Sequence, residues 1–141
     1  MPWHHMAQRI LDRVERRIGR SSAEVFLRSD FNGIGSYSQI GRVLRLLTLQ
    51  GHLVRLGYGV YAKARPSSLS GRSVPRKPLE SLAREVLEKL GIEAQLGHAA
   101  REHLSGSTQI PAQVSFDTGR RRISRKLRVG SREVRYEGRR R

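Results

Sequence analysis

The hydrophobic pattern of the chain changes abruptly at Gly51. Before this glycine, four apolar residues recur at the spacing of one helix face, and Ser36 precedes them where an N-cap belongs. After it, the runs 52–56 and 60–63 have an extended pattern and flank residues 57–59, two glycines around a tyrosine. The sequence therefore predicts a helix that ends near Gly51 and a tight β-hairpin directly after it. The four apolar residues are Ile40, Val43, Leu44 and Leu47.

An earlier apolar stripe predicts another helix, which ends near Gly19. A short strand at Val25 and Phe26 and a short helix from about Arg28 are expected next. Residues 21–24 also fit a capping box that would start a helix at Ser22, and the two interpretations exclude each other. The stripe consists of Met6, Ile10, Leu11, Val14 and Ile18.

The composition changes after the hairpin. Residues 65–78 are rich in Pro, Ser and Arg and are predicted to be a linker or an extended arm. A helix over 79–90 follows, with Pro78 at its start and Gly91 at its end. We predict an α+β fold, with residues 1–64 and 79–141 as two small domains. The second domain is expected to hold a helix over 94–104 and strands at 114–116, 123–129 and 133–136, the last two joined at Gly130 and Ser131.

The chain of 141 residues is strongly basic. Lys plus Arg number 28 against 12 acidic residues, which gives a formal net charge of +16. Such an excess destabilises the compact state by self-repulsion and favours a polyanionic partner, for which nucleic acid is the default. Only four of these cations are Lys, and the planar guanidinium of Arg suits phosphate and base edges, although a GC-rich genome would produce the same bias. Residues 118–141 hold eleven cations and two acids.

Catalytic and metal chemistry have little support in the sequence. The absence of cysteine excludes thiol nucleophiles, disulfides and thiolate zinc sites. His98, Glu102 and His103 are the closest potential ligands, but their spacing does not place the two imidazoles on one helix face. We therefore expect no metal, no cofactor and no enzymatic activity. With no signal-peptide pattern and no apolar run of membrane-spanning length, a cytoplasmic protein without membrane contact is expected.

Three short helices followed by a hairpin is the element order of a winged helix-turn-helix domain. In that architecture the third helix enters the major groove of DNA and the hairpin touches the flanking backbone or minor groove. The alternative is that the polar residues concerned are solvated positions on a packed core, and that the basic tail is a frayed terminus or binds an acidic protein. The predicted DNA-binding residues are Tyr37, Ser38, Gln39, Arg42 and Arg45 on the helix, Arg55, Tyr58 and Lys63 on the hairpin, and Arg120, Arg121, Arg122 and Arg125 in the tail.

Several motifs resemble the N-terminal winged-helix domain of AbiEi-type antitoxins and their short relatives. They are Val25-Phe26, Asp30-Phe31, Gly35-Ser36 and the closing run Arg55-Leu56-Gly57-Tyr58-Gly59-Val60-Tyr61. Residues 104–112, followed by a β run, resemble a C-terminal segment of the same short relatives, so the resemblance extends over about residues 6–136. In this chain the C-terminal unit is shorter than in the antitoxins, and residues 119–126 are more basic.

This resemblance implies an autorepressor that binds double-stranded DNA upstream of its own operon. Longer members also neutralise a nucleotidyltransferase-like toxin. We accordingly expect a sequence-specific transcriptional regulator of a mobile-element or toxin-antitoxin operon, with the apolar stripe over 79–90 as a candidate homodimer contact. The alternatives are an antitoxin-type module that binds a toxin protein, and an RNA-bound basic structural protein.

Overall fold

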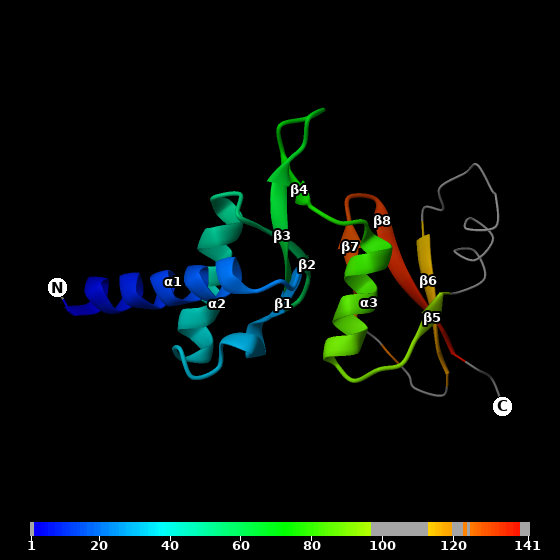
Figure 1. Cartoon of the computed structure of the whole chain (residues 1–141), viewed down its shortest axis with the longest axis horizontal. Helices are drawn as coiled ribbons and strands as arrows, with labels where there is room; N and C mark the ends of the chain where they lie inside the picture. Colours follow the sequence, from blue (N-terminus) through cyan, green and yellow to red (C-terminus); the bar gives the residue numbers. More distant parts are fainter. Residues whose placement is uncertain (1, 97–112, 120–122, 124, 139–141) are drawn as a thin grey trace. The chain divides into compact units, whose positions relative to one another are not determined.

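The computed structural model describes residues 2–96, 113–119, 123 and 125–138 (Figure 1). The described part of the chain has a mixed α+β fold with three α-helices and two four-stranded sheets. It divides into two compact units, of which the first comprises residues up to Arg55 together with Gly59–Arg76. The second comprises Leu56–Tyr58 and the residues from Lys77 onward. The expected fold class is confirmed at this level.

The first unit contains two α-helices, a short 3₁₀ helix and four strands. Its sheet has the order β1-β3-β2, with β4 paired to the far part of β3. Strands β1 and β3 are antiparallel, and Val25 lies opposite Ala62. The elements are α1 (Pro2–Arg20), β1 (Val25–Leu27), η1 (Arg28–Phe31), α2 (Tyr37–Leu49), β2 (Leu53–Gly57), β3 (Val60–Pro66) and β4 (Ser73–Pro75). The last two residues of β2 are counted with the second unit.

The core of the first unit forms where α1 and α2 turn their apolar stripes toward each other and toward the sheet. Figure 1 shows α1 crossing α2, and the two helices are in contact. Burial of such stripes supplies most of the driving force for folding, which explains why the local periodicity predicted both helices correctly. The buried cluster consists of Ile10, Val14, Phe26, Phe31, Ile34, Ile40, Val43, Leu44, Leu47, Leu53 and Tyr61.

Local capping sets the limits of α2. The Ser36 hydroxyl accepts a hydrogen bond from the Gln39 amide at 3.2 Å, and the Gln39 side chain accepts one from the Ser36 amide at 2.8 Å. This reciprocal capping box satisfies two amides at the helix start. Gly51, with φ of +84°, follows the helix end in a conformation that favours glycine. The predicted α2 boundaries and the following hairpin are confirmed.

The structure decides between the two interpretations of the segment after α1, and it revises the predicted linker. The strand at Val25 and Phe26 and the short helix from Arg28 are confirmed, and a helix starting at Ser22 does not form, because residues 25–27 pair with β3. Within the predicted linker, residues 64–66 and 73–75 pair as antiparallel strands, and the Ser67 amide donates to the Arg72 carbonyl at 2.7 Å. This pairing rests on backbone hydrogen bonds between residues with no alternating apolar pattern, so the composition alone did not reveal it.

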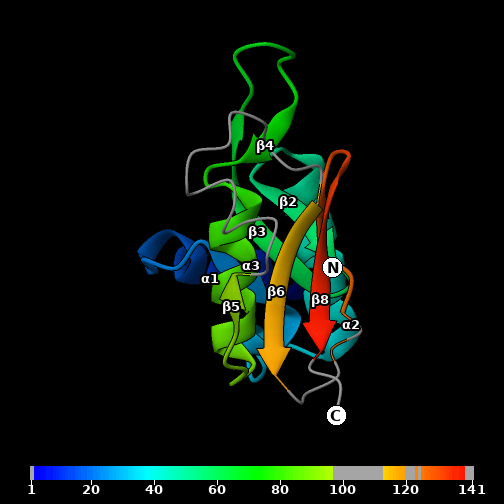
Figure 2. The same ribbon diagram turned by 90° about the vertical axis from the view of Figure 1, so that its right-hand side faces the viewer.

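The second unit packs α3 against a sheet of order β5-β6-β8-β7. Strands β6 and β8 are parallel, with Val114 opposite Val134, and β7 pairs with β8 across a turn in which Gly130 has φ of +58°. Figure 2 shows β6 and β8 side by side. The elements are α3 (Leu79–Lys89), β5 (Gln95–Leu96), β6 (Gln113–Gly119), β7 (Arg128–Val129) and β8 (Arg132–Gly138).

The sequence predictions for this unit are only partly correct. The helix expected over 94–104 is contradicted at residues 95–96, which form β5 against β6, and its remainder from 97 lies outside the described residues. The strand expected over 123–129 is limited to Arg128 and Val129. The apolar residues of α3 are buried, so the stripe predicted as a dimer contact is not exposed in the described part of the chain. These are Leu79, Leu82, Ala83, Val86 and Leu87.

Candidate nucleic-acid interface

The face of α2 opposite its buried stripe is polar and cationic. Ser38, Arg42 and Arg45 are all exposed on it, at the spacing of a single helix face. Within the part of the chain that the structure describes, neither Arg42 nor Arg45 has an acidic partner. Leu46 and Leu49 continue this face toward the helix end, with 40% and 75% of their surface exposed. We call this surface, from Ser38 to Leu49, the α2 face.

Arg28 of η1 lies against the start of α2. Its guanidinium carbon is 3.4 Å from the centroid of the Tyr37 ring, and its Nε donates a hydrogen bond to the Tyr37 carbonyl at 3.0 Å. Gly41 makes room for this contact, because a Cβ built there would lie 2.5 Å from the Arg28 guanidinium carbon. These two contacts with Tyr37 therefore fix the positive charge of Arg28 beside the exposed Tyr37 ring.

The sequence did not reveal the role of Arg28. The only signal was the glycine inside a helix, which costs helix stability and marks a close approach by another group. Which group approaches Gly41 is decided by the packing of η1 on α2. Arg28 is therefore a functional candidate that the sequence analysis missed.

Two of the predicted contact residues are engaged in local structure. The Gln39 side chain completes the α2 cap, and its amide nitrogen lies 3.8 Å from the sulfur of Met6. The Lys63 ammonium donates to the Ser21 carbonyl at 2.7 Å and lies 6.0 Å from the centroid of the Phe26 ring. Both side chains are half-buried, so their observed contacts stabilise the first unit.

Of the predicted hairpin residues, Arg55 and Tyr58 are exposed. Tyr58 has 70% of its surface exposed, and its carbonyl accepts a hydrogen bond from Arg125 Nη1 at 3.1 Å within the second unit. The Arg125 carbonyl in turn accepts a hydrogen bond from the Tyr136 hydroxyl at 2.7 Å. Burial raises the pKa of Tyr136 above its ordinary value, and the positive charge of Arg125 opposes this rise. The predicted tail residues Arg120, Arg121 and Arg122 lie outside the described residues.

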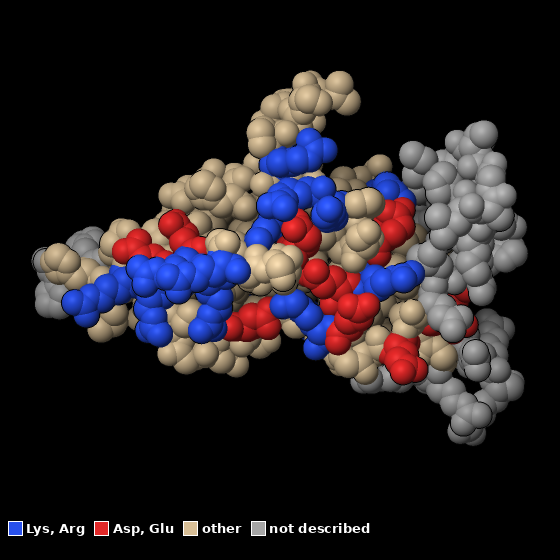
Figure 3. Space-filling model, viewed as in Figure 1, with Lys and Arg blue, Asp and Glu red and all other residues tan. Residues whose placement is uncertain are grey.

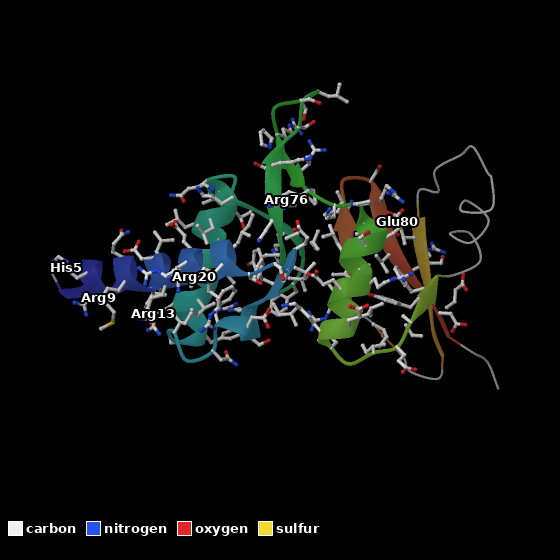
Figure 4. The ribbon with its side chains drawn as sticks, viewed as in Figure 1. His5, Arg9, Arg13, Arg20, Arg76 and Glu80 are labelled. Atoms are coloured by element: carbon white, nitrogen blue, oxygen red, sulfur yellow. The ribbon has the colours of Figure 1, made fainter. Side chains whose placement is uncertain are left out.

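A second cationic surface runs along α1. Figure 3 shows it as a blue band on the face turned to the viewer, and Figure 4 labels three of its members. The sequence showed these side chains opposite the apolar stripe, but we did not predict them as a site. Their recurrence every three or four residues was the available signal. The exposed side chains of this band are Arg9, Arg13, Arg16, Arg17 and Arg20.

Acidic residues of the first unit are partly engaged elsewhere. Glu24 pairs with Arg76 at 3.3 Å, and the Asp30 carboxylate accepts a hydrogen bond from the Leu27 amide at 2.9 Å. Asp12 accepts one from the Gln8 side chain at 3.0 Å. In the second unit, Glu80, labelled in Figure 4, pairs with Arg132. None of these acidic groups pairs with Arg9, Arg13, Arg16 or Arg20 of α1 or with Arg42 or Arg45 of α2 within the described part of the chain.

The described residues place no three His, Asp or Glu side chains where they could hold a metal ion together. The predicted weak cluster at residues 98–103 lies outside them. Among the helices that the structure describes, none has the length and apolar character needed to cross a bilayer.

The fold and its surfaces define a small, basic α+β protein built from two compact units. Residues 9–139 match the family of unknown function DUF6088, and the chain belongs to this family. No curated protein and no solved structure matches the chain.

Proposed function

We propose that this protein is a sequence-specific regulator of transcription that binds double-stranded DNA. In this proposal α1, η1, α2 and the β2–β3 hairpin act as a winged helix-turn-helix domain. The observation that carries the proposal is the α2 face, which presents Arg42 and Arg45 beside each other on the solvent side of a helix whose other side is buried.

The chemistry of the α2 face suits the major groove. The groove is about 12 Å wide and admits an α-helix, and an Arg side chain can donate two hydrogen bonds to the O6 and N7 atoms of guanine. Arg42 and Arg45 can reach base edges or the flanking phosphates, and Ser38 can donate to either. The capping box at Ser36 gives the first turn a defined backbone conformation at the start of the helix from which these side chains project.

Other parts of the first unit suit the flanking backbone. Tyr37 and Arg28 lie together at the start of α2, where a phenolic ring and a guanidinium can contact sugar and phosphate. Arg55 is exposed on β2, on the hairpin that would form the wing. The segment before α2 is only the 3₁₀ turn η1, so this domain would be a compact variant of the architecture.

The cellular role that we propose rests on the resemblance to AbiEi-type antitoxins and their short relatives. Because their winged-helix domains repress their own operons, this chain would be a cytoplasmic autorepressor of a mobile-element or toxin-antitoxin operon.

Binding to the chain's own upstream DNA tests the proposal. The full chain is titrated into labelled upstream DNA and into a shuffled duplex of equal length, at two salt concentrations. Specific recognition predicts a preference of about a thousandfold or more for the upstream DNA. Equal binding to both duplexes would show that the charge acts as a general polyanion surface and would refute the proposal.

An Arg42→Ala variant tests the role of the α2 face. We expect it to lose about 1 to 3 kcal/mol of binding free energy on upstream DNA and much less on the shuffled duplex. Arg72→Ala is the matched control, since Arg72 is exposed in the loop between β3 and β4, away from α2 in the sequence. An equal loss on both duplexes for Arg42→Ala would contradict base reading by this residue.

A further inference from the structure

The exposed arginines of α1 form one continuous surface, which we call the α1 arginine face. Arg9, Arg13, Arg16 and Arg20 follow one another at spacings of four, three and four residues, so they project from the same side of the helix. The rise of an α-helix spreads them over about 16 Å. Figure 4 shows Arg9, Arg13 and Arg20 along this side.

The C-terminal half of this face borders a groove. It is lined by side chains of α1 and by two residues beyond the helix. Arg17 is held in place, because its Nη1 donates to the Asp30 carbonyl at 2.8 Å, and Ile34 is almost completely buried. The lining residues are Arg13, Arg16, Arg17, Arg20, Ser21 and Ile34.

The acidic side chains of α1 do not neutralise this surface. Asp12 and Glu15 are the acidic residues of the helix, and Asp12 is hydrogen-bonded to Gln8 at its edge. In Figure 3 the acidic atoms over α1 lie beside the blue band and not within it. Within the described part of the chain, Arg9, Arg13, Arg16 and Arg20 have no ion-pair partner.

Such an arrangement is unfavourable in the free protein. Like charges three or four residues apart on a helix destabilise it, and here several such pairs follow one another. A phosphodiester backbone removes this repulsion, because each guanidinium can donate two parallel hydrogen bonds to phosphate oxygens. Along 16 Å of duplex there are about nine phosphate charges, enough for all four arginines.

We infer that the α1 arginine face binds the phosphodiester backbone of nucleic acid without reading its sequence. The α1 arginine face consists of side chains of α1 alone, whereas the α2 face consists of side chains of α2. The inference therefore does not depend on α2 reading an operator.

The test compares two variants of the full chain with equal net charge. In the first, Arg9, Arg13, Arg16 and Arg20 are all changed to Gln, while Arg17 is kept because it binds the Asp30 carbonyl. The matched control variant changes four exposed cations elsewhere to Gln. These are Arg72, Lys77, Arg84 and Arg135.

Binding to a shuffled duplex is measured over a series of salt concentrations. Each phosphate contact contributes about 0.9 to the slope of log K against log salt concentration. The α1 variant should therefore have a slope smaller by about three to four than the wild type, and the control should change by less than one. Replacement of the same four arginines by Lys should retain the slope, because the charge is preserved.

The upstream DNA distinguishes this inference from the proposed function. The α1 variant should lose affinity for upstream and shuffled DNA by the same factor, whereas failure of operator recognition would appear as equal binding of the wild type to both. If the Gln variant unfolds, the double variant Arg13→Gln and Arg20→Gln should show about half the change in slope. If the α1 variant and the control variant had equal slopes of log K against log salt concentration, the inference would be overturned. An acidic protein would then be the partner to test for this face.

Discussion

The contact between Arg28 and Gly41 allows a quantitative test of how η1 packs on α2. An Ala at position 41 gains about 1 kcal/mol of helix propensity, because Gly is the weaker helix former. Its Cβ would lie 2.5 Å from the Arg28 guanidinium carbon, so the guanidinium must leave the Tyr37 ring. That displacement loses a cation–π contact of about 0.5 to 1 kcal/mol and a hydrogen bond of about 0.5 to 1.5 kcal/mol.

Because of these opposing contributions, Gly41→Ala should change the free energy of unfolding differently in the wild type and in an Arg28→Ala variant. In the wild type, Gly41→Ala should be neutral or destabilising by up to about 1.5 kcal/mol. In the Arg28→Ala background no side chain occupies this space, and the same change should stabilise by about 1 kcal/mol. The double-mutant cycle therefore predicts a coupling of about 1 to 2.5 kcal/mol between the two positions.

The cycle is measured by urea denaturation of the full chain, followed by far-UV circular dichroism. All four proteins, the wild type, the two single variants and the double variant, are compared under one set of conditions. If Gly41→Ala stabilises the protein by the same amount in both backgrounds, the guanidinium does not occupy the space over position 41. That result would refute the packing of Arg28 on α2 as described.

Two further predictions concern the free energy of unfolding. Gly51→Ala should destabilise the protein by about 1 to 3 kcal/mol, because Gly51 has φ of +84° and a Cβ there would lie 2.8 Å from the Ser73 hydroxyl. Gly19→Ala, in open space on α1, should stabilise the protein by up to about 1 kcal/mol. Equal urea midpoints for the two variants would contradict this prediction. The raised pKa of Tyr136 means that the folded state holds the phenolic proton more tightly than the unfolded state does. The contribution of Tyr136 to the free energy of unfolding is therefore fully present below about pH 10 and is lost as the pH rises through the folded-state pKa. Thermal melts from neutral to alkaline pH should therefore show a smaller alkaline loss of stability for Tyr136→Phe than for the wild type, and parallel profiles would argue against this reasoning.

Predictions from the sequence were most accurate where short-range patterns define an element. The α2 helix, its Ser36 cap and the hairpin after Gly51 were all predicted within a residue or two. Each depends on contacts within a few residues, which the spacing of apolar residues and the position of the cap record directly. The exposure of Arg42 and Arg45 follows from the same periodicity, because the opposite face is apolar.

Features that depend on distant segments were missed. The residues of β4, which pairs with β3, were predicted to belong to a linker, and the residues of β5, which pairs with β6, were predicted to belong to a helix. The parallel pairing of β6 and β8 was not anticipated, since no local pattern specifies which strand lies beside which. Such pairings depend on backbone hydrogen bonds that any suitable partner can complete.

For the candidate site, the sequence alone determined the overall positive charge, the cationic solvent side of α2 and the arginine repeat of α1. Only the tertiary structure decided that Arg28 lies over Gly41 and that the Lys63 ammonium binds the Ser21 carbonyl. The physical reason is that charge and periodicity are properties of neighbouring residues, whereas the partner of a long cationic side chain depends on which carbonyls and rings the folded chain brings within its reach.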